Sequence, residues 1–256
     1  MPDSQTVHIF HIERYDGSAL FLHPFRADQS MLHTLENCRV EGHYGAEPDV
    51  SSLTEFRNEL YGLAEHAVRS WDAETRFIPR FVISSALFVV SFLFLSIVVR
   101  DPVPVLDELL ISLVVGIGSY LVQRSRGRSS ERVERKRMAM RTSIDTIVFS
   151  ESAIVYLLEE TLHMYEAEDD ALQVLLSGRR APFAESQSES ANEVLGYLSQ
   201  RFGDREFRRR ERRIMRGEQH AAEQVKRWAE HKKVDLALFC FYLRLKRALG
   251  SPKVHR

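Results

Sequence analysis

The stretch FVISSALFVVSFLFLSIVV, Phe81 to Val99, contains no charged residue and constrains the fold more than any other part of the sequence. At helical rise this stretch covers roughly 28 Å, about the thickness of the hydrocarbon core of a bilayer. A segment of this length and apolarity is typical of a transmembrane helix. We therefore predict a mainly α-helical integral membrane protein.

A second apolar run, VLDELLISLVVGIGSYLV, extends from Val105 to Val122 and carries Asp107 and Glu108 in its first turn. Carboxylates are favourable at the positive N-terminal end of a helix. The linking segment, Arg100 to Pro104, holds two prolines, whose rings and missing N–H groups end helices. The pattern predicts a two-helix transmembrane hairpin with spans 81–99 and 105–122.

Basic residues outside these runs predict the orientation of the hairpin. Arginines precede the first run, and a dense group of basic residues follows the second within 123–137, whereas the linking segment holds only Arg100. Because Lys and Arg collect in cytoplasmic flanks, we predict that both termini are cytoplasmic. The protein is then integral to the cytoplasmic (inner) membrane.

Small and acidic residues in the second run allow two interpretations. Ser112, Gly116 and Ser119 recur at helical spacing, and small residues let membrane helices approach closely. The favoured interpretation is that they pack the two spans together. In the alternative, the hairpins form an oligomer in which Asp107 and Glu108 make an acidic ring at the outer mouth of a cation pore.

Two arginine-rich segments predict contact with anionic phospholipid. The first follows the second run directly, and each basic residue near a membrane surface contributes about 1 kcal/mol of attraction. For the second, DREFRRRERRIMR (204–216), a solvated helix face is the favoured interpretation and anionic phospholipid is the next. Nucleic acid is the least favoured ligand, because no reading module frames the segment and aromatic residues are sparse. The candidate lipid contacts are Arg124, Arg126, Arg128, Arg208, Arg209, Arg210, Arg212 and Arg213.

The region before the membrane, residues 1–80, has two expected parts. In the cytoplasmic region 1–50, apolar runs lie on both sides of Asp16-Gly17, a pair suited to a tight turn, and predict a β-hairpin over Thr6–Phe25. Residues 51–80 carry apolar side chains on one helical face and predict an amphipathic helix that leads to the membrane.

Histidines are frequent in the N-terminal region, so a metal site must be weighed. His8 and His11 would point to opposite faces of a strand, and neither HExxH nor CxxC spacing accompanies them. Ordinary surface or core histidines explain the pattern, and we predict no metal and no cofactor. The histidines considered are His8, His11, His23, His33 and His43.

The region 123–256 is expected to be a cytoplasmic helical domain. Apolar residues between Ile144 and Tyr165 follow alternating three- and four-residue steps, which predict a helix in a bundle or a short coiled coil. VDLALFCFYLRLKRAL, Val234 to Leu249, has an apolar run too short to span a bilayer and predicts a buried core helix or a docking helix.

No Walker loop, nucleophile elbow, kinase motif set or metal-ligand spacing is present, so we predict that the protein is not an enzyme. The favoured function is a membrane-anchored scaffold or regulatory protein whose cytoplasmic helices bind a protein partner or form a homo-oligomer. The alternative is an oligomeric ion channel or transporter subunit with Asp107 and Glu108 at its outer mouth.

Overall fold

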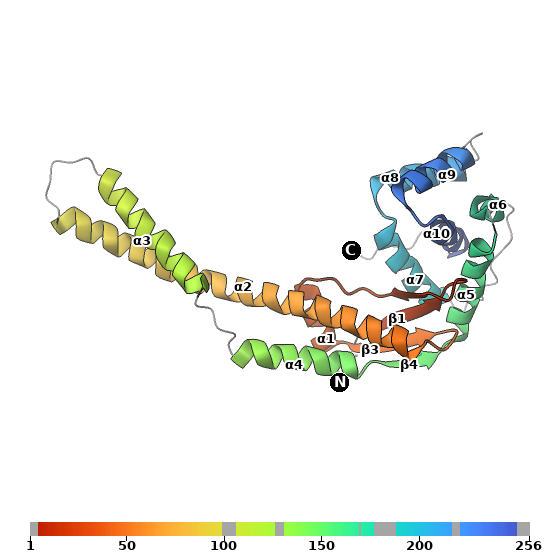
Figure 1. Cartoon of the computed structure of the whole chain (residues 1–256), viewed down its shortest axis with the longest axis horizontal. Coiled ribbons are helices and arrows are strands. Elements are labelled where there is room, and N and C mark those ends of the chain that lie inside the picture. Colours follow the sequence, from red (N-terminus) through yellow and green to blue (C-terminus); the bar gives the residue numbers. More distant parts are fainter. Residues whose placement is uncertain are drawn as a thin grey trace. The chain divides into compact units, whose positions relative to one another are not determined.

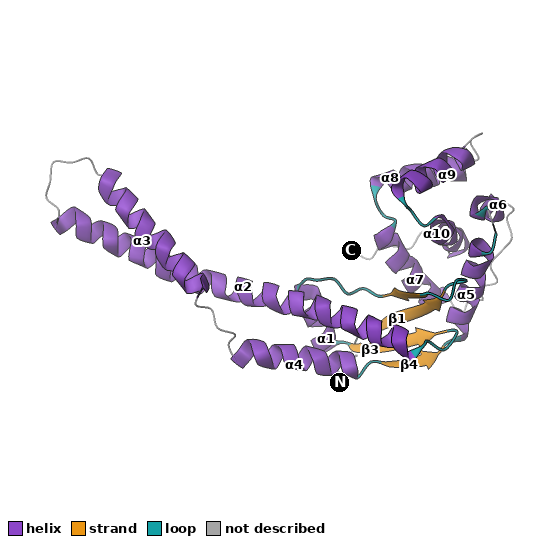
Figure 2. Ribbon diagram, in the orientation of Figure 1, coloured by secondary structure: helices purple, strands orange, loops and turns teal. Residues whose placement is uncertain are grey.

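The computed structural model describes residues 5–98, 106–125, 131–168, 170–176, 188–216 and 221–249. The described chain is mostly helical and contains a small mixed sheet, which confirms the predicted helical class (Figures 1 and 2). It divides into two compact units. Unit 1 comprises residues 1–25, 37–58 and 146–256, and unit 2 comprises residues 26–36 and 59–145.

The sheet belongs to unit 1, and the helices are shared between the two units. The strands are β1 (Thr6–Glu13), β2 (Ala19–Leu22), β3 (Arg39–Tyr44) and β4 (Val148–Glu151). The helices are α1 (Gln29–Asn37), α2 (Val50–Val98), α3 (Leu106–Ser125), α4 (Glu131–Asp145), α5 (Ala153–Glu166), α6 (Ala171–Leu176), α7 (Ser188–Arg201), α8 (Arg205–Met215), α9 (Ala221–Lys232) and α10 (Leu236–Leu249).

The predicted β-hairpin is formed by β1 and β2, which pair antiparallel. Gly17 adopts a positive φ of 78°, which a residue with a side chain rarely takes. The Asp16 carboxylate accepts hydrogen bonds from the N–H and the hydroxyl of Ser18 at 2.9 and 2.6 Å. The Asp-Gly pair therefore closes the hairpin as its residue types predict.

The rest of the sheet is parallel and has the order β2-β1-β3-β4. Strand β3 pairs parallel with β1, and β4 pairs parallel with β3 although more than a hundred residues separate them in the chain. Phe149 of β4 contacts the rings of Phe21 and Phe56 edge-on, with centroids 6.2 Å away. This aromatic contact and the backbone pairing fix β4 in the sheet.

The prediction of one helix from Ile144 to Tyr165 was wrong. Helix α4 ends at Asp145, β4 follows, and α5 begins at Ala153. The β-branched and aromatic residues at 146–149 favour a strand, and pairing with β3 outweighs the helical periodicity. The sheet also joins β4 to residues that we assigned to a separate N-terminal region, so unit 1 combines both ends of the chain.

Helices α5 and α7 contact the sheet, and α10 packs on α5 and α7, so that the three helices form the core of unit 1 (Figure 1). Phe10 and Ile12 of β1 are fully buried against this layer. The C-terminal helix α10 is a buried core helix, as its short apolar run predicts. Its buried residues are Leu238, Phe239, Cys240, Phe241, Tyr242, Leu243, Arg244 and Leu245.

Unit 2 is helical and is held in part by charged side chains. Arg137 of α4 donates from Nε and Nη2 to the two carboxylate oxygens of Glu65 on α2, at 2.7 and 2.8 Å. The ammonium of Lys136 lies 5.3 Å from the ring centroid of Trp71 and pairs with Glu36 of α1. These contacts join α1, α2 and α4.

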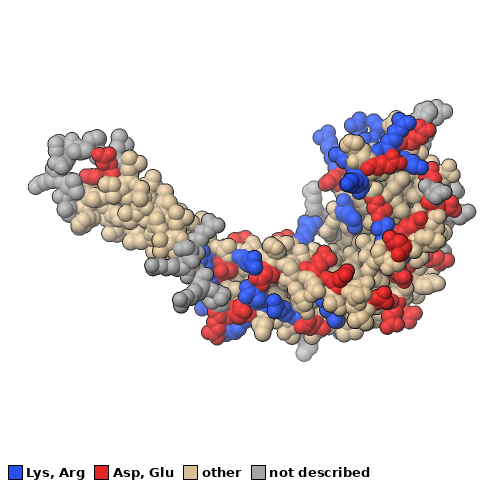
Figure 3. All heavy atoms as spheres, viewed as in Figure 1, with Lys and Arg blue, Asp and Glu red and all other residues tan. Residues whose placement is uncertain are grey.

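Helix α2 contains both the predicted amphipathic helix and the first predicted span without a break at Pro79. Among the described residues it is the one helix long and apolar enough to cross a membrane. Its apolar stretch is only 6% buried, and Val90 and Phe94 are 63% and 62% exposed. In Figure 3 the surface of this stretch shows almost no charge.

The second predicted span, α3, is shorter in its apolar part. Between Glu108 and Gln123 the uncharged residues cover only about 21 Å at helical rise, below the roughly 30 Å of a bilayer core. Residues 99–105, which include the linking segment Arg100 to Pro104 and one end residue of each predicted span, lie outside the described residues.

Candidate functional site

The acidic residues of α3 lie in its first turn, and the structure gives them different surroundings. Asp107 is exposed. Glu108 is half-buried and accepts a hydrogen bond of 2.8 Å from the hydroxyl of Ser96 on α2. One of the two predicted pore-mouth carboxylates is therefore used within the chain to tie α3 to α2.

The small residues of α3 have different surroundings. Ser112 is fully buried. A Cβ added at Gly116 would lie 3.2 Å from the Cβ of Phe88, which is tighter than most packing contacts, and 3.4 Å from the carbonyl oxygen of Ser84. Ser119 is half-buried and accepts a hydrogen bond from Gln123 within α3. Gly116 thus permits a close approach of the two helix backbones.

The arginine-rich segment 204–216 forms α8, while Arg126 and Arg128 lie outside the described residues and Arg124 is described by its backbone alone. Arg208, Arg209 and Arg212 are exposed. The two other predicted contacts are partly engaged. Arg210 lies over the ring of Trp228 at 5.5 Å, and Arg213 donates to Gln224 at 2.9 Å.

Both glutamates of α8 are paired with side chains of neighbouring helices. Glu206 accepts a hydrogen bond of 2.6 Å from the indole N–H of Trp228 on α9. Glu211 pairs with Lys246 of α10 at 2.7 Å. Because both carboxylates are used internally, the outer face of α8 is strongly basic, as the blue cluster over α8 in Figure 3 shows.

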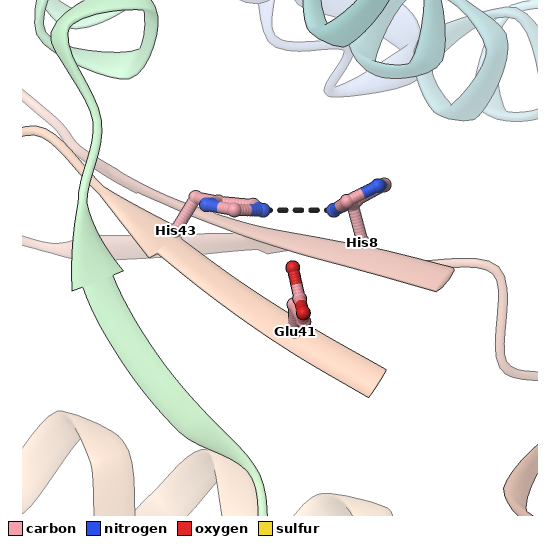
Figure 4. Close-up of side chains that lie close together, drawn as sticks. All are labelled: His8, Glu41 and His43. Atoms are coloured by element: carbon pink, nitrogen blue, oxygen red, sulfur yellow. Dashed lines mark hydrogen bonds between the residues drawn. The ribbon is translucent and has the colours of Figure 1, made fainter. Parts of the chain in front are cut away.

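A histidine cluster lies on the sheet of unit 1 and was not predicted from the sequence. In the parallel register, His8 of β1 lies opposite Glu41 of β3, and Phe10 lies opposite His43. Residues two apart in a strand share a face, so all three polar side chains point to the same side (Figure 4). Nδ1 of His8 lies 2.8 Å from Nε2 of His43.

The three side chains of this cluster are close enough to share one ion. One ligand atom from each of His8, Glu41 and His43 lies within 4.8 Å of the others. All three residues are half-buried. Glu41 also pairs with Arg39 at 2.9 Å, and the Arg39 side chain is 73% exposed.

Helix α7 approaches the cluster from the helical layer. The hydroxyl of Tyr197 donates to the backbone carbonyl of His8 at 2.9 Å. One turn earlier, Glu193 has a buried Oε2 with no hydrogen-bond partner among the described residues. Burial raises the pKa of Glu193, as does nearby Glu189, and His8 lowers it. Glu193 is therefore an electrostatic neighbour of His8.

The surroundings of His43 favour a neutral imidazole. Burial lowers the pKa of His43, and the neighbouring His8 lowers it further, whereas Glu41 raises it. A neutral imidazole has a free nitrogen lone pair, which can accept a hydrogen bond or bind a metal ion. His11 lies on the opposite face of β1 against Phe21, as strand alternation predicts.

Comparison with known proteins identifies no relative of this chain. No family model matches it, and neither a curated protein nor a solved structure matches it significantly. A function must therefore be inferred from the described residues themselves.

Proposed function

We propose that this protein is a non-enzymatic, membrane-anchored scaffold or regulatory protein whose cytoplasmic helices bind a protein partner or a second copy of the chain. The observation that carries this proposal is the composition of α2. In its second turn the helix carries Phe56, whose ring stacks on Phe21 of the sheet with centroids 4.1 Å apart, and it continues into a stretch with exposed apolar residues such as Val90. One continuous helix thus links a folded polar unit to a surface suited to lipid.

A two-helix anchor is the form of membrane attachment that we propose. The hydrogen bond between Ser96 and Glu108 and the close approach at Gly116 support α3 as the second helix of a hairpin. The short apolar part of α3 is compatible with a span because its flanking polar residues can reach the interface and the bilayer can thin locally. By the distribution of basic residues, both termini face the cytoplasm.

The basic face of α8 supports the binding role. Arg208, Arg209 and Arg212 are exposed, while Glu206 and Glu211 are paired with Trp228 and Lys246. Arg side chains bind carboxylates through planar, paired hydrogen bonds, so this face suits a carboxylate-rich protein surface. Anionic phospholipid is the second ligand that the same charge would attract.

The first experiment tests the anchor and the partner together. A photo-crosslinking amino acid is placed at Arg209 of α8, with a matched control at Glu223, and the membranes are illuminated first and washed with carbonate afterwards. We expect the protein to stay in the membrane pellet and to give one discrete crosslinked product at Arg209 only. Release by carbonate, or no product at Arg209, would overturn the proposal.

The alternative function, an oligomeric channel, rests on the exposed Asp107 at the start of α3. The mass of the detergent-purified protein, measured by light scattering and corrected for detergent, separates the two functions. A ring-sized oligomer whose liposome flux falls when Asp107→Asn and Glu108→Gln are introduced would favour the channel. A monomer or dimer favours the scaffold, because so few helices cannot surround a pore.

A further inference from the structure

We propose that His8, Glu41 and His43 form a binding site for a divalent transition-metal ion, with Zn²⁺ as the ion that fits their chemistry best. The proposal is independent of the membrane anchor and of the partner. It rests on the arrangement in Figure 4, where side chains from β1 and β3 converge on one side of the sheet.

The donor types select the metal. Two imidazole nitrogens and one carboxylate oxygen are ligands that Zn²⁺ commonly combines. Mg²⁺ and Ca²⁺ are bound almost entirely through oxygen, so His8 and His43 make a poor site for them. Three protein ligands leave a fourth tetrahedral position for water.

The geometry needs only a small adjustment. The facing nitrogens of His8 and His43 are 2.8 Å apart in their hydrogen bond. Around tetrahedral Zn²⁺ with Zn–N bonds of 2.0–2.1 Å, the two nitrogens would be about 3.3 Å apart. A rotation of either half-buried ring provides this separation, and the ion replaces the single hydrogen bond with two stronger contacts.

The neighbouring residues also suit a metal site. The exposed Arg39 holds Glu41 by a surface ion pair, and such pairs are weak in water, so an ion can displace Arg39. Phe10 lies beside both rings, with centroids 6.4 Å from His8 and 5.6 Å from His43, and forms an apolar wall.

Glu193 is assigned as a positioning residue for His8. Metal-bound histidines usually donate their second ring N–H to a carboxylate, which fixes the ring and strengthens the ligand. In Figure 4 the second nitrogen of His8 points away from His43, and Glu193 of α7 is an electrostatic neighbour of His8 with a buried oxygen that lacks a partner. A metal ion would therefore join β1, β3 and α7.

The test uses the full-length protein in detergent, with any affinity tag removed and bound metal stripped by chelator. Zn²⁺ is titrated against a chromophoric chelator, and Co²⁺ is titrated separately because its visible spectrum reports coordination geometry. We expect one ion of Zn²⁺ per chain and a tetrahedral Co²⁺ spectrum. No binding above that of the free chelator would overturn the proposal.

Variants identify the ligands. His8→Ala and His43→Ala should each weaken Zn²⁺ binding by more than the roughly 10- to 100-fold expected for Glu193→Gln, which removes an outer carboxylate. His231→Ala, which removes an exposed histidine of α9, and Cys38→Ser, which removes a half-buried thiol, should leave affinity unchanged.

A further variant controls for loss of folding. If an alanine variant loses its circular dichroism, Glu41→Gln takes its place, because it keeps the size of a half-buried side chain and removes only the anionic ligand. Weaker Zn²⁺ binding by folded Glu41→Gln protein supports the site. Unchanged binding by the folded histidine variants, or loss on Cys38→Ser alone, would assign the ion elsewhere and overturn the proposal.

Discussion

Helix α10 and the second half of α2 have similarly apolar sequences but opposite surroundings. Most of the 14 residues of α10 are buried, including Phe239 with no exposed surface. In α2 the apolar stretch is 6% buried. The difference follows from length and position, because the apolar run of α10 is too short to cross a bilayer and is used as a core, whereas α2 is long enough to use lipid as its solvent.

The largest expected effect is in the core. Phe239 packs against Phe202 and Trp228, with ring centroids 5.4 and 6.2 Å away, and Phe239→Ala should lower the free energy of unfolding of unit 1 by about 3–5 kcal/mol. Denaturant unfolding in detergent, followed by Trp228 fluorescence in a Trp71→Phe background, measures the loss. Phe94→Ala in α2, where the ring is 62% exposed, is the matched control and should not move this transition.

An equal loss from both phenylalanine variants would show that exposure in the structure does not distinguish the two helices. It would also mean that the apolar stretch of α2 packs against protein.

Membrane insertion, in contrast, should depend on the apolar stretch of α2 and not on exposed residues of unit 1. Val90 is 63% exposed at the middle of the apolar stretch, and Val90→Arg should oppose insertion by about 2.5–3.5 kcal/mol. The measurement is the fraction of protein that remains in the pellet after carbonate extraction. Val148→Arg, which changes a 74% exposed valine on β4, should leave that fraction at the wild-type level. Full retention of Val90→Arg would contradict a lipid-facing α2.

The features that could be predicted from the sequence are those carried by neighbouring residues. Asp16-Gly17 between apolar runs indicated the hairpin, and the absence of charge in 81–99 indicated the long apolar helix. The core position of α10 followed from the length of its apolar run. In each case the residues of one short segment are enough to determine the structure that forms.

The features that could not be predicted depend on residues far apart in the chain. Strand β4 is fixed by pairing with β3. Because its apolar residues follow a helical spacing, the sequence predicted a helix there. The histidine cluster needs the parallel register that places His8 opposite Glu41. The two-residue spacing of Glu41 and His43 was the one local signal, because it places both on the same face of a strand. No local pattern identifies β1 as the neighbouring strand.

A smaller effect is expected at the buried carboxylate of Glu159, which joins α5 to the sheet. It accepts the N–H groups of Glu13 and Ala46 at 3.0 and 2.8 Å, and Glu159→Ala should cost about 1–3 kcal/mol by leaving these donors without partners. Burial raises the pKa of Glu159 above the ordinary 4.5, against the lowering by these backbone bonds. The Glu159 carboxyl therefore stays protonated to a higher pH in the folded state than in the unfolded state.

The resulting pH dependence has a defined sign. The stability of unit 1 should fall as pH rises from 4.5 through the raised pKa, because the folded state binds more protons in that window. Unfolding free energies from Trp228 fluorescence across this window measure the slope. Glu159→Gln, which cannot ionise, should flatten it, and an unchanged slope in that variant would assign the titration to another group.

The smallest effect is expected in unit 2, at Glu65, where the sign is opposite. Hydrogen bonds from Arg137 lower the pKa of Glu65 below 4.5 against the opposing effect of burial, and Arg69 adds to the lowering. The pair should therefore stabilise unit 2 fully above pH 4.5, and this contribution should be lost as pH falls through the lowered pKa. Because Glu65 and Arg137 are partly exposed, Glu65→Gln should cost only about 1 kcal/mol or less.

Trp71 provides the probe for this comparison, since it lies beneath Lys136 in unit 2 and can be followed in a Trp228→Phe background. Glu131→Gln is the matched control, because Glu131 lies in the first turn of α4 with an 84% exposed side chain and its pair with Arg135 is long at 3.4 Å. If the free energy of unfolding of unit 2 rises as the pH falls below 4.5, the sign of the effect is opposite to the one expected. It would mean that the desolvation of Glu65 outweighs its two bonds to Arg137, so that its carboxylate behaves like that of Glu159.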